Sequence, residues 1–584
     1  MRSTLLLYVG LASLLPEAAW SQANPAPPAA VPVPLPAERV PQGSPFARDR
    51  PSPLPQTAPG LPLGLTPPAA EFAPGQTVPV VSAAVLGATV FPPAEIATVT
   101  AGLTGPAVKL DAIEQARLGL LSRYRNAGYM LTSVSATVDA GGALRISVTE
   151  GYIAEVKLDG DIGPAGTQVL RFLNRITEER PVRISTLERY LLLANDVPGV
   201  TVKSVLQRSA TDAAAVTLVA RVSRRVFDGL LTADNRAFRL TGPEQLLAVG
   251  SFNSFTQFGE RTEFSILHSF NNTQTFGQAA TEFFVGSTGT KVRLYAGAGA
   301  TNPSGFLRAL GYDGQTRVFG IQASYPLIRS RQQTLSLNAT LDAIESDIST
   351  DTGPNATPVR SSFDSLRILR GGADYVLQDL VLGGDRTGVN TLSVRLSRGL
   401  DGLGATSNGD PQAGRPGSRV DFFKFNAELS RSQTLFQPWS DASVVLYGLL
   451  AGQISNSVLP PAEKFFLGGI RYNRGFFAGE VTGDNALTAT LELQLNTALS
   501  IDAFGYPLPI NAQFYAFHDW GETWENQRDP NRRLSSSGVG LRTQITPNLG
   551  LEVEGVSRMT RQPQGPGVAA LHADAVYWRV ITRF

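Results

Sequence analysis

The sequence predicts a transmembrane β-barrel of about 16 antiparallel strands, preceded by two small α/β domains. Three observations support this fold class: an apolar N-terminal segment typical of exported proteins, a mixed helix and strand pattern over about 78–224, and an apolar–polar alternation over 227–584. With 584 residues, the chain is too long for one compact core, since a domain usually holds about 100 to 200 residues. We therefore expect several modules in series.

The first 77 residues are expected to direct export and to form a linker. Residues 1–23 resemble a signal peptide, because their apolar run, Leu5–Leu15, is shorter than the roughly 20 residues that a membrane-spanning helix needs. A short membrane anchor is the alternative. Residues 24–77 form a Pro-rich linker that favours an extended polyproline conformation. Composition does not distinguish a tether from disorder without a role, and only residues 37–50 could form a short helix.

Residues 78–152 predict the first α/β domain. Between Leu110 and Leu131 apolar side chains recur at helical spacing, and Gly128 is suited to ending the helix. Strands are expected at Leu144–Val148 and, after a short turn, at Ile153–Leu158. The helix should therefore lay one apolar face on a sheet.

Residues 153–226 repeat this plan. A helix is expected over Thr167–Ile176, and Ser185–Glu188 has the pattern of a capping box that begins a second helix. Asp196–Gly199 should end that helix, and strands are expected at Val200–Gln207 and Ala214–Val222. Two domains of similar plan therefore stand in tandem.

Residues 227–584 alternate between apolar and polar side chains, as a barrel strand does. In Phe423–Leu429 the odd positions are apolar and the even positions are polar. A soluble β-sandwich would also alternate, with its apolar face turned inward. The export signal, the absence of cysteine and the last strand, Val576–Phe584, favour a membrane barrel. We expect an even number of strands near 16. Similar alternation occurs in Phe319–Leu327, Leu335–Leu341 and Leu487–Leu495.

The last strand shows which face should meet lipid. Val576, Trp578, Val580, Thr582 and Phe584 would point outward, and a terminal Phe is typical of outer-membrane barrels. The alternate positions, which include two arginines, would then line a water-filled interior that tolerates charge. These inward arginines are Arg579 and Arg583.

Composition argues against several other classes. The chain has 50 Lys+Arg, 49 Asp+Glu and a net charge of +1, so it lacks the basic field that nucleic-acid binding usually requires. It has no cysteine and 3 histidines, which argues against disulfides, thiolate nucleophiles and most metal sites. His518 lies beside Asp519, but neighbouring residues on a strand face opposite ways. We find no nucleophile elbow, zinc-protease motif or P-loop, and we expect no catalytic residue, metal or cofactor.

Two segments suggest a functional role. The glycine-rich segment Phe465–Phe476, followed by Gly483-Asp484, lies between two strand patterns and could fold back into the barrel to present Arg474 inside. In Phe517–Gly521, Asp519 could project inward and pair with Arg474 to anchor the loop. Each motif alone is weak, because loop arginines and strand aspartates are usually solvated. The predicted anchor comprises Arg474, Gly475, Phe476, Asp519 and Gly521, with support from Gly468, Gly469, Gly483 and Asp484.

In this order, these segments resemble the outer-membrane transporters of two-partner secretion, the haemolysin-activator type of the Omp85 superfamily. The resemblance covers nearly all of the chain after the signal peptide. The residues that carry it are Glu150–Ile153, Asp196–Gly199, Asp234-Asn235, Leu467–Phe476 and Phe517–Gly521.

The resemblance implies a 16-stranded barrel in the outer membrane, two periplasmic POTRA domains and an inward loop whose arginine pairs with an aspartate of the wall. Arg474 and Asp519 are the matching positions. The implied partner is an unfolded secreted protein of adhesin or haemolysin type, which POTRA sheet edges could bind by strand addition. Outer-membrane lipid would surround the barrel, and no ATP would be needed.

The chain departs from the family pattern in places. Members often carry an N-terminal helix that plugs the pore, but the equivalent stretch here is rich in proline. Asn473 stands where an aliphatic residue is commoner, and Arg236 stands where Gly is common. Two other functions remain open: an Omp85-type factor that inserts other barrels, which usually has more POTRA domains, and a passive porin or adhesin.

Overall fold

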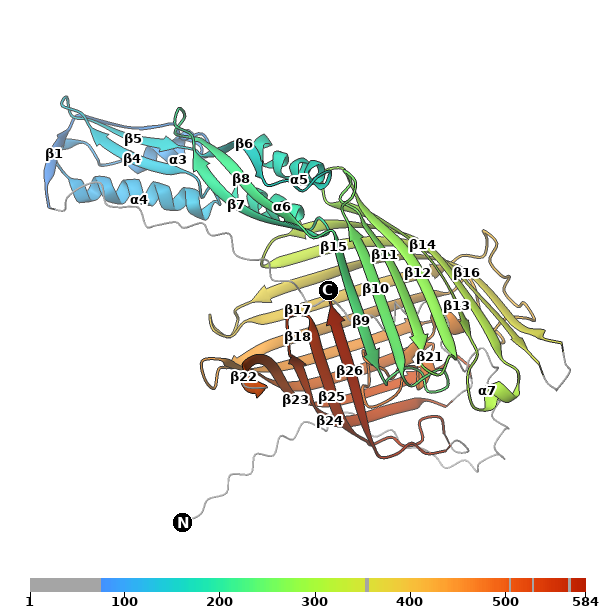
Figure 1. The fold of residues 1–584 in the computed structure, drawn as a ribbon. Helices are drawn as coiled ribbons and strands as arrows, with labels where there is room; N and C mark the ends of the chain where they lie inside the picture. The colour runs from blue at the N-terminus through green and yellow to red at the C-terminus, as the bar shows by residue number, and fades with distance from the viewer. Residues whose placement is uncertain (1–74, 352–356, 504–505, 528–529, 566–568) are drawn as a thin grey trace, which may run out of the picture. The chain divides into compact units, whose positions relative to one another are not determined.

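The computed structural model describes residues 75–351, 357–503, 506–527, 530–565 and 569–584. The predicted signal peptide, the helix considered at 37–50 and the linker up to residue 74 lie outside these residues. Within them, the chain forms two α/β units followed by a closed barrel (Figure 1).

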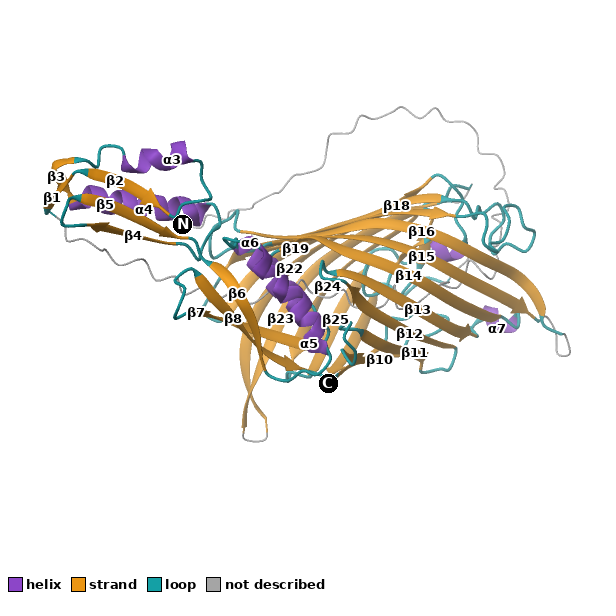
Figure 2. Cartoon of the chain, turned by 90° about the horizontal axis from the view of Figure 1, so that it is seen from above, coloured by secondary structure: helices purple, strands orange, loops and turns teal. Residues whose placement is uncertain are grey.

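The first α/β unit packs a long helix on a three-stranded sheet (Figure 2). The central strand β5 (Ala143–Thr149) pairs parallel with β2 (Ser82–Leu86) and antiparallel with β4 (Ser133–Val138). Helix α4 (Leu110–Asn126) buries its apolar face, as its spacing predicts, and Gly128 follows with a φ of +91°. Strands β2 and β4 were not predicted, nor were the other short elements before the helix, because all are too brief to show a period: β1 (Thr77–Val80), α3 (Pro93–Ala97), η1 (Thr98–Thr100) and β3 (Gly105–Lys109).

The second unit has the same plan. Its central strand β8 (Ala215–Arg224) pairs parallel with β6 (Tyr152–Asp159) and antiparallel with β7 (Val200–Arg208). The apolar faces of its helices bury Val169, Phe172, Leu187 and Leu193 in the core. The helical elements are α5 (Ala165–Leu173), η2 (Asn174–Glu178) and α6 (Ile184–Asn195). No helix in the described part of the chain is long and apolar enough to cross a membrane.

The predicted capping box at Ser185–Glu188 is wrong. Helix α6 begins at Ile184, its N-cap is Arg183, and no side chain caps it. Ser185 is therefore already helical, so its hydroxyl is not placed to accept from the free N–H groups of the first turn. Packing of the apolar face, which includes Ile184 and Leu187, sets the start of the helix.

The barrel contains sixteen strands among the described residues, each antiparallel to its neighbours, which confirms the predicted fold class. The first and last strands, β9 and β26, close it through pairs from Arg579↔Asp234 to Arg583↔Leu230. The strands are β9 (Phe227–Asp234), β10 (Gln245–Asn253), β11 (Arg261–Ser269), β12 (Gln274–Val285), β13 (Thr290–Thr301), β14 (Asp313–Arg329), β15 (Gln333–Thr350), β16 (Val359–Asp379), β17 (Gly388–Gly399), β18 (Phe423–Phe436), β19 (Ala442–Ser455), β22 (Asn485–Ala503), β23 (Tyr506–Trp524), β24 (Arg532–Gln544), β25 (Leu549–Arg558) and β26 (Asp574–Arg583).

The barrel buries polar side chains and exposes apolar ones. On β22, Leu491 is 57% exposed while Glu492 is 2% exposed, and on β23 the exposed Phe514 alternates with inward residues. A soluble sandwich would show the reverse. The outward apolar residues therefore form the surface that faces lipid, and charged residues such as Arg579 face the interior.

The connections of the barrel differ between its two ends. At the end where β9 begins, the turns are short, as at 286–289 and 330–332. At the other end the connections are longer, as at 302–312, which holds α7 (Phe306–Ala309), and at 400–422 and 456–484. Outer-membrane barrels have short periplasmic turns and long extracellular loops. The α/β units therefore join the barrel at its periplasmic end.

Candidate functional site

The connection 456–484 between β19 and β22 is packed inside the barrel. It contains η3 (Pro461–Glu463) and a hairpin of β20 (Phe465–Leu467) and β21 (Val481–Gly483). Leu467, Phe476 and Val481 are buried in one apolar cluster with Leu534 of β24. We call residues 456–484 the inward loop, because this cluster attaches the loop to the interior wall.

Two glycines allow the tight path of the inward loop. Gly468 has a φ of +98°, and a Cβ there would lie 2.0 Å from the carbonyl oxygen of Phe477. A Cβ on Gly475 would lie 2.4 Å from the Oγ of Ser536 on β24. Gly469 donates its N–H to the Phe476 carbonyl at 3.0 Å. Larger side chains at 468 and 475 would push the loop away from the wall.

Asn473, the departure from the family pattern, has a physical explanation. Its φ is +52°, a left-handed conformation that asparagine tolerates better than an aliphatic residue does. Its Oδ1 accepts a hydrogen bond from Thr488 Oγ1 at 3.0 Å. Asn473 therefore helps to fix the turn that presents the next residue, Arg474.

The structure brings Arg474 and Asp519 together. Asp519 Oδ2 accepts from the backbone N–H of Arg474 at 2.8 Å and from its Nε at 3.1 Å, and Oδ1 accepts from Nη2 at 3.1 Å. The guanidinium carbon also lies 3.9 Å from the centre of the Phe517 ring. Asp519 is completely buried and Arg474 is 8% exposed, so the pair lies within the barrel interior.

Other charged residues extend this pair into a network that sequence reasoning missed. Arg474 Nη1 donates to Glu492 on β22, whose other oxygen accepts from Arg542 on β24 at 2.7 Å. Glu554 on β25 binds Arg236 and accepts from Tyr515 at 2.6 Å. Glu492 lies on the polar alternation of an otherwise apolar strand, a signal that could have identified it. Arg236, the second departure from the family pattern, thus supplies a counter-charge to Glu554.

The backbone beside Arg474 is also held by side chains of the wall. The carbonyl of Gly475 accepts from Arg558 Nε at 2.6 Å and from the Tyr577 hydroxyl at 3.2 Å. Phe476 is completely buried. Gly521 lies on β23, where it pairs with Thr488 of β22. The predicted anchor residues therefore converge at the tip of the inward loop.

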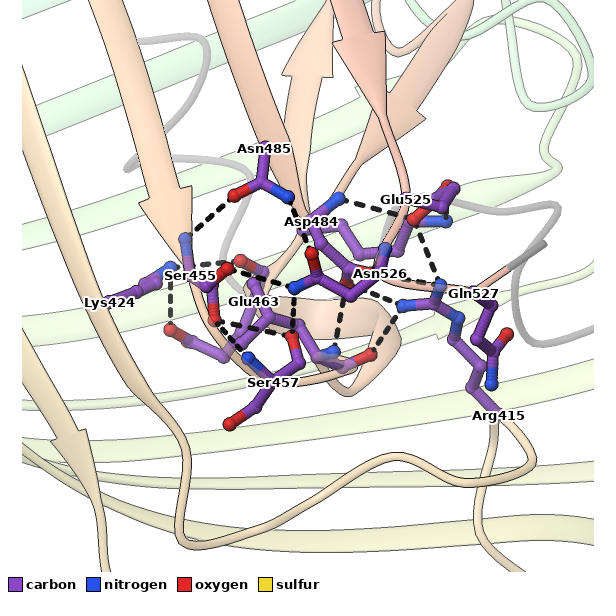
Figure 3. Close-up of polar contacts among 12 residues, drawn as sticks. Arg415, Lys424, Ser455, Ser457, Glu463, Asp484, Asn485, Glu525, Asn526 and Gln527 are labelled. Atoms are coloured by element: carbon purple, nitrogen blue, oxygen red, sulfur yellow. Dashed lines mark hydrogen bonds and ion pairs between the residues drawn. The ribbon is translucent and has the colours of Figure 1, made fainter. Parts of the chain in front are cut away.

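The predicted support residues Gly483 and Asp484 lie at the end of the inward loop. Gly483 pairs with Phe465 in the hairpin. Asp484 is completely buried, and its oxygens accept from the backbone N–H groups of Leu459 and Asn526, both at 2.8 Å. Figure 3 shows that Asp484 also faces Arg415, which donates to it at 2.6 and 3.1 Å. The structure thus places Asp484 away from the Arg474 group, in a second polar cluster.

A cavity of about 690 Å³ with both polar and apolar lining residues opens at the periplasmic end of the barrel. Arg542, which binds Glu492 of the Arg474 network, lies in its lining. Asn496, Gln513 and Glu552 are other polar lining residues. In the described part of the chain, no group of three or more His, Cys, Asp or Glu residues is placed to hold a metal ion.

Glu150, in the segment that joins the two α/β units, has a structural role in the first one. Its carboxylate accepts from the N–H of Thr89 at 2.7 Å, from the Tyr124 hydroxyl at 2.5 Å and from the Thr89 hydroxyl. Burial alone would raise its pKa, but these hydrogen bonds hold the pKa of Glu150 below its usual value. Gly151 is required beside it, because a Cβ there would lie 2.4 Å from the Leu131 carbonyl oxygen.

Two protein-family models match this chain. The family model described as haemolysin secretion/activation protein ShlB/FhaC/HecB matches residues 214–543, and the model of the ShlB-type POTRA domain matches residues 78–151. The chain is 25% identical over 456 residues to the hemolysin transporter protein ShlB of Serratia marcescens, covering 74% of this chain and 75% of that protein. It is 21% identical over 458 residues to the heme/hemopexin transporter protein HuxB of Haemophilus influenzae, covering 76% and 77%.

Solved structures show the same fold. CdiB from Escherichia coli aligns with a TM-score of 0.68 at 20% identity, covering 90% of this chain and 94% of that chain. CdiB from Acinetobacter baumannii aligns with a TM-score of 0.60 at 16% identity, covering 88% and 91%.

Proposed function

Because the chain belongs to the haemolysin secretion/activation family of ShlB, FhaC and HecB, it is an outer-membrane transporter of two-partner secretion, and we propose that its Arg474–Asp519 pair anchors the inward loop in the pore. Its POTRA domains face the periplasm, where they receive a secreted partner protein, and the barrel exports that protein. We assign the POTRA domains to residues 78–152 and 153–226 and the barrel to 227–584. The matching three-stranded sheets and the start of β9 at Phe227 support these boundaries.

The observation that carries the proposal is the burial of the Arg474–Asp519 pair. Removing two charges from water is costly unless they are paired, and breaking a buried pair costs about 3–5 kcal/mol. Arg474 satisfies this requirement only while the inward loop occupies the interior. The pair therefore favours the position of the loop inside the barrel.

Passage of a polypeptide requires the inward loop to be displaced. Phe476 and Leu467 occupy the interior against the wall, so the loop and an exported chain compete for the same space. We propose that the arriving partner displaces the loop and that the Arg474–Asp519 contact forms again after export. Folding of the partner outside the cell would supply the driving force, with no nucleotide consumed.

The POTRA sheets offer edges for a chain without fixed structure. Strands β4 and β2 end the first sheet, and β7 and β6 end the second, with no further strand paired to them in the described residues. Strand addition uses backbone hydrogen bonds and so tolerates varied sequences. We propose that an exoprotein of haemolysin or adhesin type binds there, in keeping with relatives named as transporters of hemolysin and of heme/hemopexin.

Secretion by variants of the anchor tests this function. Arg474→Ala and Asp519→Ala should both abolish export of the secreted partner, because the loop of either variant cannot form its contact with the wall again after export. The barrel of each variant should still insert and conduct in planar bilayers. Arg533→Ala is the matched control, because Arg533 pairs with Glu522 at 2.9 Å and its side chain is 62% exposed. Export that continues unchanged in both anchor variants would contradict the proposed role.

A further inference from the structure

The extracellular connection 400–422 carries a buried arginine. Arg415 is 1% exposed, although arginines of long surface connections are usually solvated. Its guanidinium contacts Leu459, Asp484 and Glu525, which belong to other extracellular connections, and Figure 3 shows Asp484 and Glu525 beside it. Such burial requires a structural reason, because an unpaired buried cation is costly.

Arg415 binds both ends of the inward loop. Its Nη1 donates to Asp484 Oδ1 at 2.6 Å and to the Leu459 carbonyl at 3.0 Å, and its Nη2 donates to Asp484 Oδ2 at 3.1 Å. Leu459 lies where the loop enters the barrel and Asp484 lies where it leaves. The two contacts to Asp484 form a two-pronged arginine–carboxylate pair, which fixes direction as well as distance.

A third connection completes the cluster. Arg415 Nη2 also donates to Glu525 Oε2 at 2.9 Å, and Glu525 binds Lys464 of the inward loop at 2.7 Å. Glu525 follows β23, so Arg415 ties the connection after β17 to the inward loop and to the connection after β23. The carboxylates that Arg415 binds differ from Asp519 and Glu492, which bind Arg474.

The first part of the inward loop, which contains Glu463, is attached to the barrel wall by separate contacts. Glu463 binds Lys424 of β18 and Arg370 of β16, both at 2.7 Å. These two partners lie on strands, whereas Arg415 lies on a connection. Arg415 can therefore move away from the inward loop without disturbing a barrel strand. Lys424 and Arg370 cannot, because they are part of the barrel wall.

We propose that Arg415 is a second latch on the inward loop, at the extracellular end of the barrel, and that the loop leaves the interior only when both Arg415 and Arg474 release it. This inference rests on the proposed displacement of the loop during export. The connection 400–422 thereby stabilises the closed pore from its extracellular side.

A single introduced cysteine can report exit of the loop, because the natural chain has no cysteine. Ala478 lies near the loop tip and is 2% exposed, so Ala478→Cys should react slowly with a membrane-impermeant maleimide added to intact cells. In that background, Arg415→Gln should raise the labelling rate at least tenfold. Arg474→Ala should also raise it, and the double variant should show roughly the product of the two effects, as independent sites do.

Arg419→Gln is the matched control. Arg419 lies in the same connection, but its guanidinium binds Asp421 of that connection at 2.8 Å and its side chain is 55% exposed. Labelling in this variant should stay at the rate of the Ala478→Cys protein. Heat-modifiable migration in gels shows that each barrel is folded, so the labelling rate reports the position of the loop and not loss of the fold.

The outcomes separate the latch from the proposed function. If Arg474→Ala accelerates labelling and Arg415→Gln does not, the second latch is overturned and the proposed function stands. Labelling that neither variant accelerates would overturn the proposed displacement as well. If Arg415→Gln does not insert, Glu525→Gln is compared with Lys464→Gln, since both lose the Lys464–Glu525 pair and only the first weakens the contact of Arg415. Faster labelling in Glu525→Gln than in Lys464→Gln supports the latch, and equal labelling overturns it.

Discussion

Asp519→Asn keeps the shape of the side chain at the loop tip and removes its charge. Asp519 accepts three hydrogen bonds from Arg474 between 2.8 and 3.1 Å. Breaking a buried ion pair costs about 3–5 kcal/mol, and we take the lower end, because Glu492 still binds Arg474. At about 1.4 kcal/mol for each factor of ten, the ratio of loop inside to loop outside should fall about a hundredfold.

Planar-bilayer recordings measure this change as the fraction of time that single pores are open. We expect that fraction to rise strongly in Asp519→Asn and to stay near the wild-type value in Glu522→Gln. Glu522 lies on the same strand and binds the exposed Arg533, and exposed pairs contribute about 0–1 kcal/mol. Equal open fractions in Asp519→Asn and the wild type would refute the anchoring role of the pair.

Three further changes follow from the geometry. The pKa of Glu150 is lower in the folded state than in the unfolded state. The stability that Glu150 contributes is therefore present above its unfolded pKa of about 4.3 and is lost as the pH falls through its folded pKa. The melting temperature of the first POTRA domain should drop more steeply below about pH 4.3 in the wild type than in Glu150→Gln. Gly475→Ala should block secretion as the anchor variants do, because its Cβ keeps the loop from returning to the wall after export. Ser536→Gly should partly restore secretion by removing the atoms 2.4 and 2.5 Å from the new Cβ. Asn473→Val should open the pore more often than Asn473→Gly in bilayer recordings, because a β-branched residue is strained at a φ of +52° by about 1–2 kcal/mol.

The alternation of side chains predicted the barrel well. Period two over Phe423–Leu429 separates lipid-facing from interior residues, and strand β18 follows it. The period of α4 was equally clear. Short elements such as α3 and β1 escaped prediction, since a period needs several turns or repeats to be visible. The start of α6 was misplaced because packing of Ile184 decided it and not local capping chemistry.

The candidate site was only partly predictable. Arg474 and Asp519 were identified because each lies in a recognisable segment. The partners Glu492, Glu554 and Arg542 come from three strands, and nothing in one strand's pattern indicates which inward charges meet across a barrel. Arg415 was missed for the same reason: its partner Asp484 is 69 residues away and its own segment resembles an ordinary surface loop.

The central claim is that the inward loop must leave the interior for export. Asn473 and Thr488 are hydrogen-bonded at 3.0 Å between loop and wall, so cysteines at both positions can be joined by a short bifunctional thiol reagent in a chain that otherwise lacks cysteine. Secretion of the partner, measured before and after cross-linking of the same cells, should stop when the loop is joined to β22. Secretion that continues at the rate of the unlinked protein would contradict the claim.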